Sequence, residues 1–289
     1  RLRGGRGQRP YGRMGAATRA LSYGVTLSTP MRVVSVERWG SLLGLLEDRG
    51  AGGVWFEVLD LAQVLDHDET AGTRLSAAAS LGAIRLGTFV SSGAPGSALM
   101  GDVKLVRGRA VVGLDEFNQN EADPSPGLYV IDLRPLFDDN AGTPMAVLAT
   151  APADGVRAVE LSGGLAWLAA ESGPVGSVEA WNIANALAEP PTAIPNTVVG
   201  RTLLAGHPEG LVVRGSWAFA STAVNSSIQP GVFAWDVSVP ATPRLLGSIP
   251  ERSDNTTCVG SQSLRNSLVV DGNRLFFTSP SGTTIIELE

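Results

Sequence analysis

Cysteine, lysine and histidine are nearly absent from this chain of 289 residues. Cys258 is the single cysteine, which excludes an internal disulfide and a zinc site built from several cysteines. The histidines are His67 and His207, and Lys104 is the single lysine. A Ser/His/Asp arrangement would need one of these histidines, and the sequence contains no Gly-x-Ser-x-Gly turn, Walker loop or dinucleotide-binding motif. The common catalytic motifs are therefore not indicated.

Charge and long apolar runs are also scarce. Charged residues make up 17% of the chain and hydrophobic residues 44%, a balance typical of a folded globular protein. No apolar run approaches the roughly 18 residues that span a bilayer, and the net charge of −6 disfavours nucleic acid as a partner. Arginines are frequent in residues 1–20, which we expect to be a disordered segment rather than a binding arm. Residues 21–289 are expected to form one domain.

One pattern repeats along the chain: a run of β-forming residues, then Asp, Asn or Glu, then an aliphatic residue. The polar anchors of its copies are Asp60, Asp132, Asn182, Asp236 and Glu287, separated by 72, 50, 54 and 51 residues. Before each anchor lie two apolar runs joined at a glycine, which suits a tight hairpin turn. A further strand-like run follows most anchors, and proline precedes it at 144 and 243, as suits an edge strand.

Each unit therefore predicts four antiparallel strands in about 50 residues, the size of a β-propeller blade. Only 41–47 and 61–65 have helix-like patterns, and Gly44 weakens the first. We count five blades and predict an all-β propeller. The fifth, at 268–288, has only three strands, and 21–27 could supply its fourth strand and close the ring. A closed five-bladed ring and a truncated larger ring both fit.

The residues from 231 to 247, GVFAWDVSVPATPRLLG, resemble the LVIVD repeat of bacterial propellers, and 127–133 match its first half. The resemblance implies a bacterial surface or secreted protein, and it transfers no catalytic residue. WD40 repeats are the nearest competitor, because Gly206-His207 and Trp235-Asp236 have a plausible spacing, but that pair occurs once. We interpret the anchor carboxylates as acceptors for turn backbone N–H groups rather than as ligand contacts.

Strand alternation places the loop between the second and third strands on the same face as the links between blades. We expect long polar loops at 115–126, 151–154, 171–176, 205–210, 221–230 and 251–262 to form a binding surface there. The candidate ligand-binding residues are Asp115, Glu116, Asn118, Asn120, Asp123, Glu171, His207, Asn225, Arg252 and Asp254.

Calcium is kept as an alternative for one of these loops. Glu116, Asn118 and Asn120 alternate as oxygen ligands would, with Asp123 nearby, but the EF-hand pattern is not met. A solvated acidic loop is the preferred interpretation, and the same holds for the acidic segment 66–69. No other cofactor is predicted.

Two functions remain open. We favour a non-catalytic, monomeric scaffold that binds a protein or carbohydrate partner in the bacterial periplasm or at the cell surface. The alternative is a propeller hydrolase or lyase that uses acidic groups at the ring centre, with or without calcium.

Overall fold

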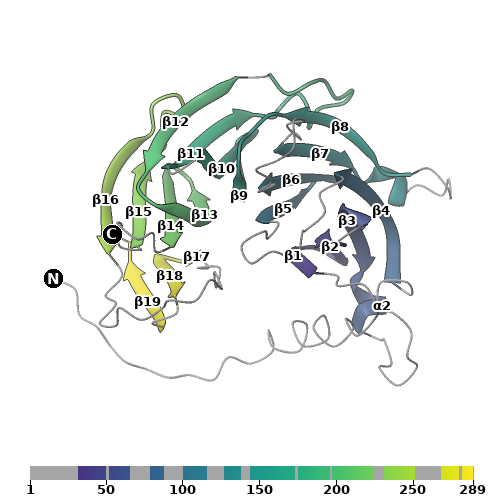
Figure 1. The fold of residues 1–289 in the computed structure, drawn as a ribbon, viewed down its shortest axis with the longest axis horizontal. Helices are drawn as coiled ribbons and strands as arrows, with labels where there is room; N and C mark the ends of the chain where they lie inside the picture. The colour runs from purple at the N-terminus through teal and green to yellow at the C-terminus, as the bar shows by residue number, and fades with distance from the viewer. Residues whose placement is uncertain are drawn as a thin grey trace.

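Nearly all the described chain is β-structure. The computed structural model describes residues 32–49, 52–65, 79–87, 100–115, 127–137, 144–172, 175–195, 197–223, 231–250, 268–279 and 282–288. They form five antiparallel sheets, arranged as an arc about a common axis in Figure 1. Strands within each sheet follow sequence order, so each sheet is one meander. We name the sheets blades 1 to 5.

The bounds of the elements follow the predicted repeat. Blade 1 contains β1 (Arg32–Trp39), β2 (Leu42–Asp48), β3 (Val54–Asp60), α2 (Leu61–Leu65) and β4 (Ser80–Gly87). Blade 2 contains β5 (Met100–Val106), β6 (Arg109–Asp115), β7 (Leu128–Asp132), the 3₁₀ turn η3 (Arg134–Leu136) and β8 (Ala146–Ala151). Blade 3 contains β9 (Val156–Ser162), β10 (Leu165–Ser172), β11 (Val175–Asn182) and β12 (Val198–Leu204). Blade 4 contains β13 (His207–Arg214), β14 (Trp217–Ala223), β15 (Gly231–Asp236) and β16 (Arg244–Pro250), and blade 5 contains β17 (Leu268–Asp271), β18 (Arg274–Ser279) and β19 (Gly282–Glu287).

The first strands of the blades, β1, β5, β9, β13 and β17, are the inner strands, and each contacts the next along the arc. The predicted all-β blades, including a three-stranded fifth sheet, are confirmed. Residues 21–27, expected to complete blade 5, lie outside the described residues. The choice between a closed five-bladed ring and a truncated larger one therefore stays a prediction.

The hairpin between the first two strands of each blade turns at a glycine with positive φ, as predicted. These glycines are Gly40, Gly108, Gly163, Gly215 and Gly272. The residue after each anchor then donates its backbone N–H to a carbonyl of that turn. The five bonds are Leu61 N to Ser41 O, Leu133 N to Gly108 O, Ile183 N to Gly164 O, Val237 N to Ser216 O and Leu288 N to Asn273 O, all 2.7–3.0 Å long. Each blade thus ties its third strand to its first hairpin.

Four of the five anchors also act as interpreted from the sequence. A side-chain oxygen of each accepts the N–H two residues on, at 2.8–3.1 Å: Asp60 from Ala62, Asp132 from Arg134, Asn182 from Ala184 and Asp236 from Ser238. This Asx turn leads the chain out of the third strand. The anchors are therefore part of the blade structure.

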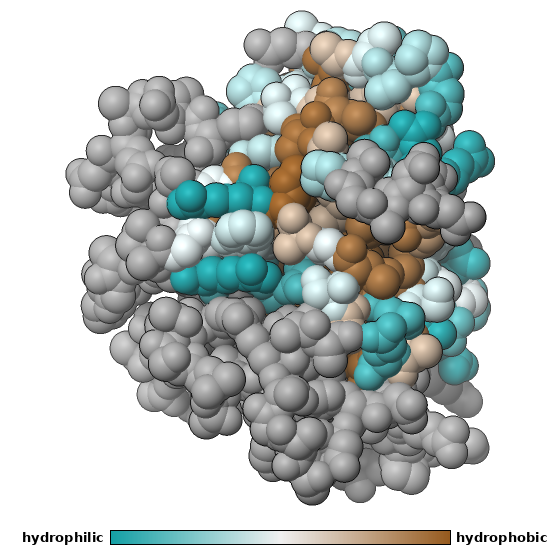
Figure 2. All heavy atoms as spheres, turned by 90° about the vertical axis from the view of Figure 1, so that its right-hand side faces the viewer, coloured by the Kyte–Doolittle hydropathy of each residue, from teal (hydrophilic) through white to brown (hydrophobic). Residues whose placement is uncertain are grey.

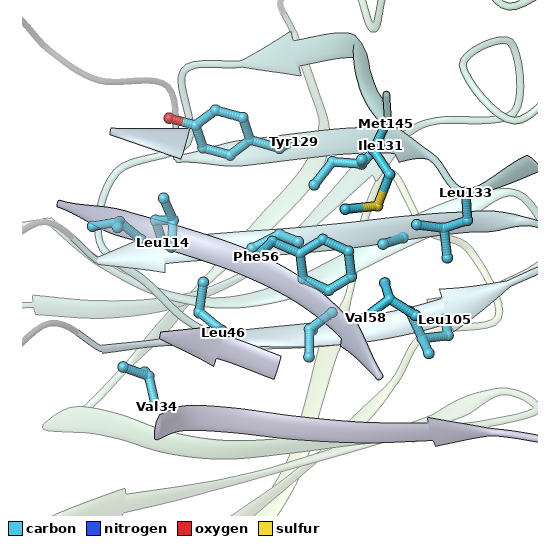
Figure 3. Packing of buried hydrophobic residues seen from close by; sticks show 14 of the residues in the cluster. Val34, Leu46, Phe56, Val58, Leu105, Leu114, Tyr129, Ile131, Leu133 and Met145 are labelled. Carbon is cyan, nitrogen blue, oxygen red and sulfur yellow. The ribbon is translucent and has the colours of Figure 1, made fainter. Parts of the chain in front are cut away.

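Apolar side chains fill the spaces between neighbouring blades, because a single sheet cannot bury both of its faces. Figure 3 shows the interface of blades 1 and 2, where Phe56 and Leu46 meet Ile131 and Leu105. Equivalent clusters lie between blades 2 and 3, 3 and 4, and 4 and 5. The other face of blade 1 is covered differently among the described residues: Leu43, Leu45 and Leu59 pack against Val64 of α2 and Ala79. The longer first repeat supplies this cover.

The helix-like pattern at 41–47 does not form a helix, in line with its interruption by Gly44, because 42–47 belong to β2. One expectation needs correction. Segments 171–176 and 205–210 are mostly strand rather than long loops, because β10 pairs with β11 as far as Ser172–Val175 and β13 begins at His207.

The outer strands carry some exposed apolar side chains. Figure 2 shows an apolar band flanked by polar residues on the right-hand side of Figure 1, where β4 and β8 lie. Leu81 of β4 and Val147 of β8 are exposed. Within the described ranges, no helix has the length and apolar character needed to cross a bilayer.

Candidate functional site

Asp115, Glu171 and His207, three of the ten candidate residues, lie in one cluster at the loop end of the blades. They come from the end of β6, the end of β10 and the start of β13, which belong to three successive blades. The other seven lie outside the described residues: Glu116, Asn118, Asn120, Asp123, Asn225, Arg252 and Asp254. The acidic segment 66–69 lies outside them too.

Arg157 joins this cluster and was not predicted. Its guanidinium lies 3.1 Å from Oδ2 of Asp115, 2.5 Å from Oε2 of Glu171 and 3.2 Å from Oε1 of Glu209. The other carboxylate oxygen of Glu171 pairs with Nδ1 of His207. We name Asp115, Arg157, Glu171, His207 and Glu209 the loop-face cluster. It connects blades 2, 3 and 4 through charged groups.

Two β-bulges place Arg157 and Glu209. In blade 3 the pairing of β9 with β10 skips Arg157, because Ala158 faces Ala169 and Val156 faces Ala170. In blade 4 the pairing of β13 with β14 skips Glu209 in the same way, between Pro208 and Gly210. A bulge adds an unpaired residue and redirects its side chain, and bulges are frequent beside functional sites. Successive blades therefore use the same irregularity near the same end of the inner strand.

The cluster is buried toward its centre and open at one side. The side chains of Glu209 and Arg157 are 3% and 13% exposed, while that of His207 is 32% exposed. Burial raises the pKa of Asp115, an effect that the charge of Arg157 opposes and that of Glu171 reinforces. With three carboxylates and one guanidinium, the loop-face cluster carries surplus negative charge when His207 is neutral.

A second charged group lies further along the inner strands, and we name it the inner-strand cluster. Nζ of Lys104 lies 3.0 Å from Oε1 of Glu160 and 3.9 Å from Oδ2 of Asp102, which connects β5 to β9. The carboxylate of Asp102 accepts hydrogen bonds from the Ser35 hydroxyl at 2.8 Å and the Val159 N–H at 3.1 Å. Asp102 thereby touches the inner strands of blades 1 and 3 from blade 2.

Glu37 of β1 completes the inner-strand cluster electrostatically. Burial raises the pKa values of Glu37 and Glu160; Lys104 opposes both shifts and Asp102 adds to them. Burial alone would lower the pKa of Lys104, but the charges of Asp102, Glu160 and Glu37 raise it. The alternative hypothesis expected acidic groups at the ring centre, and these carboxylates stand on inner strands.

In the described part of the chain, no group of three or more His, Cys, Asp or Glu residues has an arrangement that could hold a metal ion. The calcium candidates lie outside that part, so calcium binding stays a prediction. The WD40-like pair is not brought together either. His207 begins β13, whereas Asp236 ends β15 beside Trp217, at the opposite end of the blade.

Successive antiparallel blades around a common axis, packed through their faces, make this chain a β-propeller. No protein-family model and no curated protein matches its sequence. Solved structures similar to it include hydrazine synthase from Kuenenia stuttgartiensis, with 13% identity and a TM-score of 0.56 over 91% of this chain and 66% of that one.

Two further structures have the same kind of similarity. A functionally unknown protein from Desulfotomaculum acetoxidans has 10% identity and a TM-score of 0.53, covering 90% of this chain and 69% of its own. The WD40 domain of Toxoplasma gondii coronin has 12% identity and a TM-score of 0.50, covering 89% and 60%. The chain thus spans 60–69% of the length of these structures. Similarity at this level shows the fold and nothing about activity.

Proposed function

We propose that the protein is a non-catalytic binding scaffold that holds its ligand at the loop-face cluster. The carrying observation is the pair of equivalent bulges at Arg157 and Glu209, together with the position of the Arg157 guanidinium between Asp115, Glu171 and Glu209. Charged side chains held on packed strands form a preorganised site, because neighbouring contacts restrict their rotamers. Strands of three blades contribute, so the site depends on the assembled propeller.

The charge balance of the cluster favours a cationic group on the ligand. Arg157 neutralises one of the three carboxylates, and partial burial reduces the screening of the remaining charge by salt. A basic side chain of a protein partner or an amino group on a carbohydrate would meet this requirement.

The resemblance of 231–247 to LVIVD repeats supports a bacterial surface or periplasmic location. Cell fractionation with an antibody against the protein tests the location, and a purely cytoplasmic signal would contradict it.

Binding can be tested with fluorescently labelled peptides of equal length, one rich in Lys and Arg and the other rich in Glu. Fluorescence anisotropy should show that the basic peptide binds and the acidic peptide does not. Glu171→Gln and Glu209→Gln should each weaken binding of the basic peptide by about tenfold, the equivalent of one charged hydrogen bond.

The matched control is Glu287→Gln in blade 5, whose side chain is 66% exposed and lies outside the loop-face cluster. It should bind like the wild type. Thermal unfolding of each variant shows whether the propeller is intact. Equal binding of both peptides, or of all the folded variants, would contradict the proposal.

A second proposal is an acid–base enzyme centred on the inner-strand cluster. The specific observation is that Glu160 lies beside Lys104, with Oε1 3.0 Å from Nζ, and that burial raises the pKa values of Glu37 and Glu160; a raised carboxyl pKa suits a general acid. A screen of chromogenic glycosides, with Glu160→Gln as the inactive control, tests it. The candidate calcium ligands for this second proposal are Glu116, Asn118, Asn120 and Asp123. A melting temperature that is the same in calcium and in chelator would exclude calcium binding.

A further inference from the structure

We propose that His207 makes the loop-face cluster responsive to pH, so that a cationic ligand binds above neutral pH and is released in mild acid. The inference rests on the proposed function, since it concerns ligand binding at that site. It starts from Glu171, whose two carboxylate oxygens face different cations. Oε2 faces Arg157 at 2.5 Å, and Oε1 faces Nδ1 of His207.

Arg157 remains charged at every physiological pH, whereas histidine is the side chain that ordinarily gains or loses its charge between pH 5 and 8. Glu171 is therefore shared between a permanent cation and a switchable one. Glu171 of β10 pairs with His207, and the charge of His207 lowers the pKa of Asp115 of β6. Arg157 of β9 and Glu209 of β13 belong to the same cluster, because Arg157 pairs with Asp115, Glu171 and Glu209.

The position of His207 makes its charge decisive for a ligand. Its side chain is 32% exposed, against 12% for Glu171 and 3% for Glu209, so the imidazole lies at the solvent side of the carboxylates. A cation approaching Glu171 from solvent therefore encounters His207. When the imidazole is protonated, it repels the ligand and neutralises Glu171 at the same time.

The charge of the cluster changes accordingly. Three carboxylates and one guanidinium leave a net charge of −2 with neutral His207 and −1 with protonated His207. Loss of half of the attracting charge weakens binding of a cation. The coupling between the two binding events is reciprocal. Because protonation of His207 weakens binding of the cation, a bound cation disfavours protonation of His207 by the same factor.

The test measures binding of the labelled basic peptide between pH 5.5 and 8.0 at constant ionic strength. The wild type should lose about tenfold in affinity from pH 8.0 to 5.5, within the usual range of coupling between sites. His207→Gln, which carries no charge, should keep the high affinity throughout. His207→Arg, which is always charged, should bind weakly throughout.

Burial raises the pKa of Asp115, so Asp115→Asn tests whether this carboxyl group rather than His207 carries the pH dependence. The variant removes one carboxylate of the cluster and should bind more weakly at every pH, but its affinity should still fall toward acid. If His207→Gln keeps the wild-type pH dependence and Asp115→Asn loses it, the proposed role of His207 is wrong. A basic peptide that binds equally at all pH values also overturns this inference while leaving the binding function intact. No binding at any pH contradicts the binding function itself.

A second readout follows the imidazole directly. The chain has only two histidines, so the His207 proton signal in an NMR titration is identified by its loss in His207→Gln. Saturating basic peptide should shift the midpoint of that signal to lower pH. An unchanged midpoint in the presence of bound peptide would overturn the inference.

Discussion

Asp132 accepts a hydrogen bond of 2.7 Å from Nη1 of Arg109, a side chain that is only 2% exposed. Nη2 of the same guanidinium donates to Glu189 at 2.6 Å, so one buried cation connects the anchor of blade 2 to blade 3. Arg134 also binds Asp132, through Nη2 at 2.6 Å. This anchor therefore has an electrostatic role as well as its Asx turn.

We predict that Asp132→Ala lowers the free energy of unfolding by about 3 kcal/mol or more, because buried Arg109 loses the carboxylate of Asp132 and keeps that of Glu189, whose side chain is 61% exposed. Asp236→Ala is the control, since Arg244 pairs with that anchor at 3.3 Å and is 73% exposed; its ion pair should contribute less than about 1 kcal/mol. Urea unfolding at pH 7 measures both. Equal losses of unfolding free energy in the two variants would show that the buried ion pair of Asp132 stabilises the protein no more than its Asx turn does.

The same residue predicts a dependence on pH. Partial burial alone would raise the pKa of Asp132, but hydrogen bonds from Arg134 and the charge of Arg109 lower it. A lowered pKa in the folded state gives stability that is complete above the unfolded-state value, about 3.9, and is lost as the pH falls through the folded-state value. The difference in stability between wild type and Asp132→Asn should thus shrink as the pH is lowered from about 5 to 2. A constant difference over that range would contradict this assignment.

Glu37 should behave with the opposite sign. Burial raises its pKa, so its contribution to stability is complete below the unfolded-state value and is lost as the pH rises through the folded-state value. Glu37→Gln cannot ionise, and we predict that it is more stable than the wild type at pH 7.5 and equal to it in acid. Chemical unfolding at both pH values provides the measurement. A less stable variant at pH 7.5 would mean that attraction to Lys104 exceeds the cost of burial.

Arg157 should matter more for stability than an exposed arginine. Arg157→Met keeps much of the side-chain volume but leaves Asp115, Glu171 and Glu209 without their shared cation, which should cost about 3–5 kcal/mol. Arg244→Met, on the exposed side of blade 4, should change stability by less than about 1 kcal/mol. Thermal unfolding compares the two. A small effect of Arg157→Met on stability would show that Asp115, Glu171 and Glu209 are accommodated without the guanidinium, through protonation or hydration.

Close packing between blades 2 and 3 depends on Gly113. A Cβ added there would lie 2.3 Å from Cγ1 of Val156 and 2.6 Å from Cγ2 of Val159. Gly113→Ala should therefore cost about 1–3 kcal/mol through overpacking. Gly247→Ala, where the added Cβ meets nothing within 4 Å, should be neutral or stabilise by about 0.5 kcal/mol. A neutral Gly113→Ala would show that the blades can separate slightly without loss.

The blades were predictable because their signals are local. Each glycine turn, anchor and edge-strand proline acts within a few residues, so Gly108, Asp132 and Pro144 identify blade 2 from sequence alone. The three-stranded fifth unit was recognised for the same reason. Strand ends were less predictable, because pairing with a neighbour extended β10 to Ser172 and started β13 at His207.

The candidate site was only partly predictable. Asp115, Glu171 and His207 were placed on one face by strand alternation, but their contacts depend on how three blades pack. Arg157 was missed because its strand was identified from the apolar run that starts at 158, and a bulge has no clear signal in one sequence. A charged residue within an otherwise apolar inner strand, as at Arg157 and Glu160, is the signal that could have found it. Glu209 lies in the segment 205–210 that was expected on the binding surface, but it was not singled out as a candidate residue.

The bond from the residue after each anchor back to its own hairpin has a consequence for how the chain acquires its structure. Because this bond lies within one repeat, most strand pairing connects residues that leave the ribosome close together in time. A growing polypeptide can therefore form one sheet after another during synthesis, with each new sheet covering the apolar side of the one before. Because each repeat also contains the bond that ties its third strand to its first hairpin, a duplicated or exchanged repeat carries that bond with it. Duplication of whole repeats is therefore a simple route by which such arrays change length.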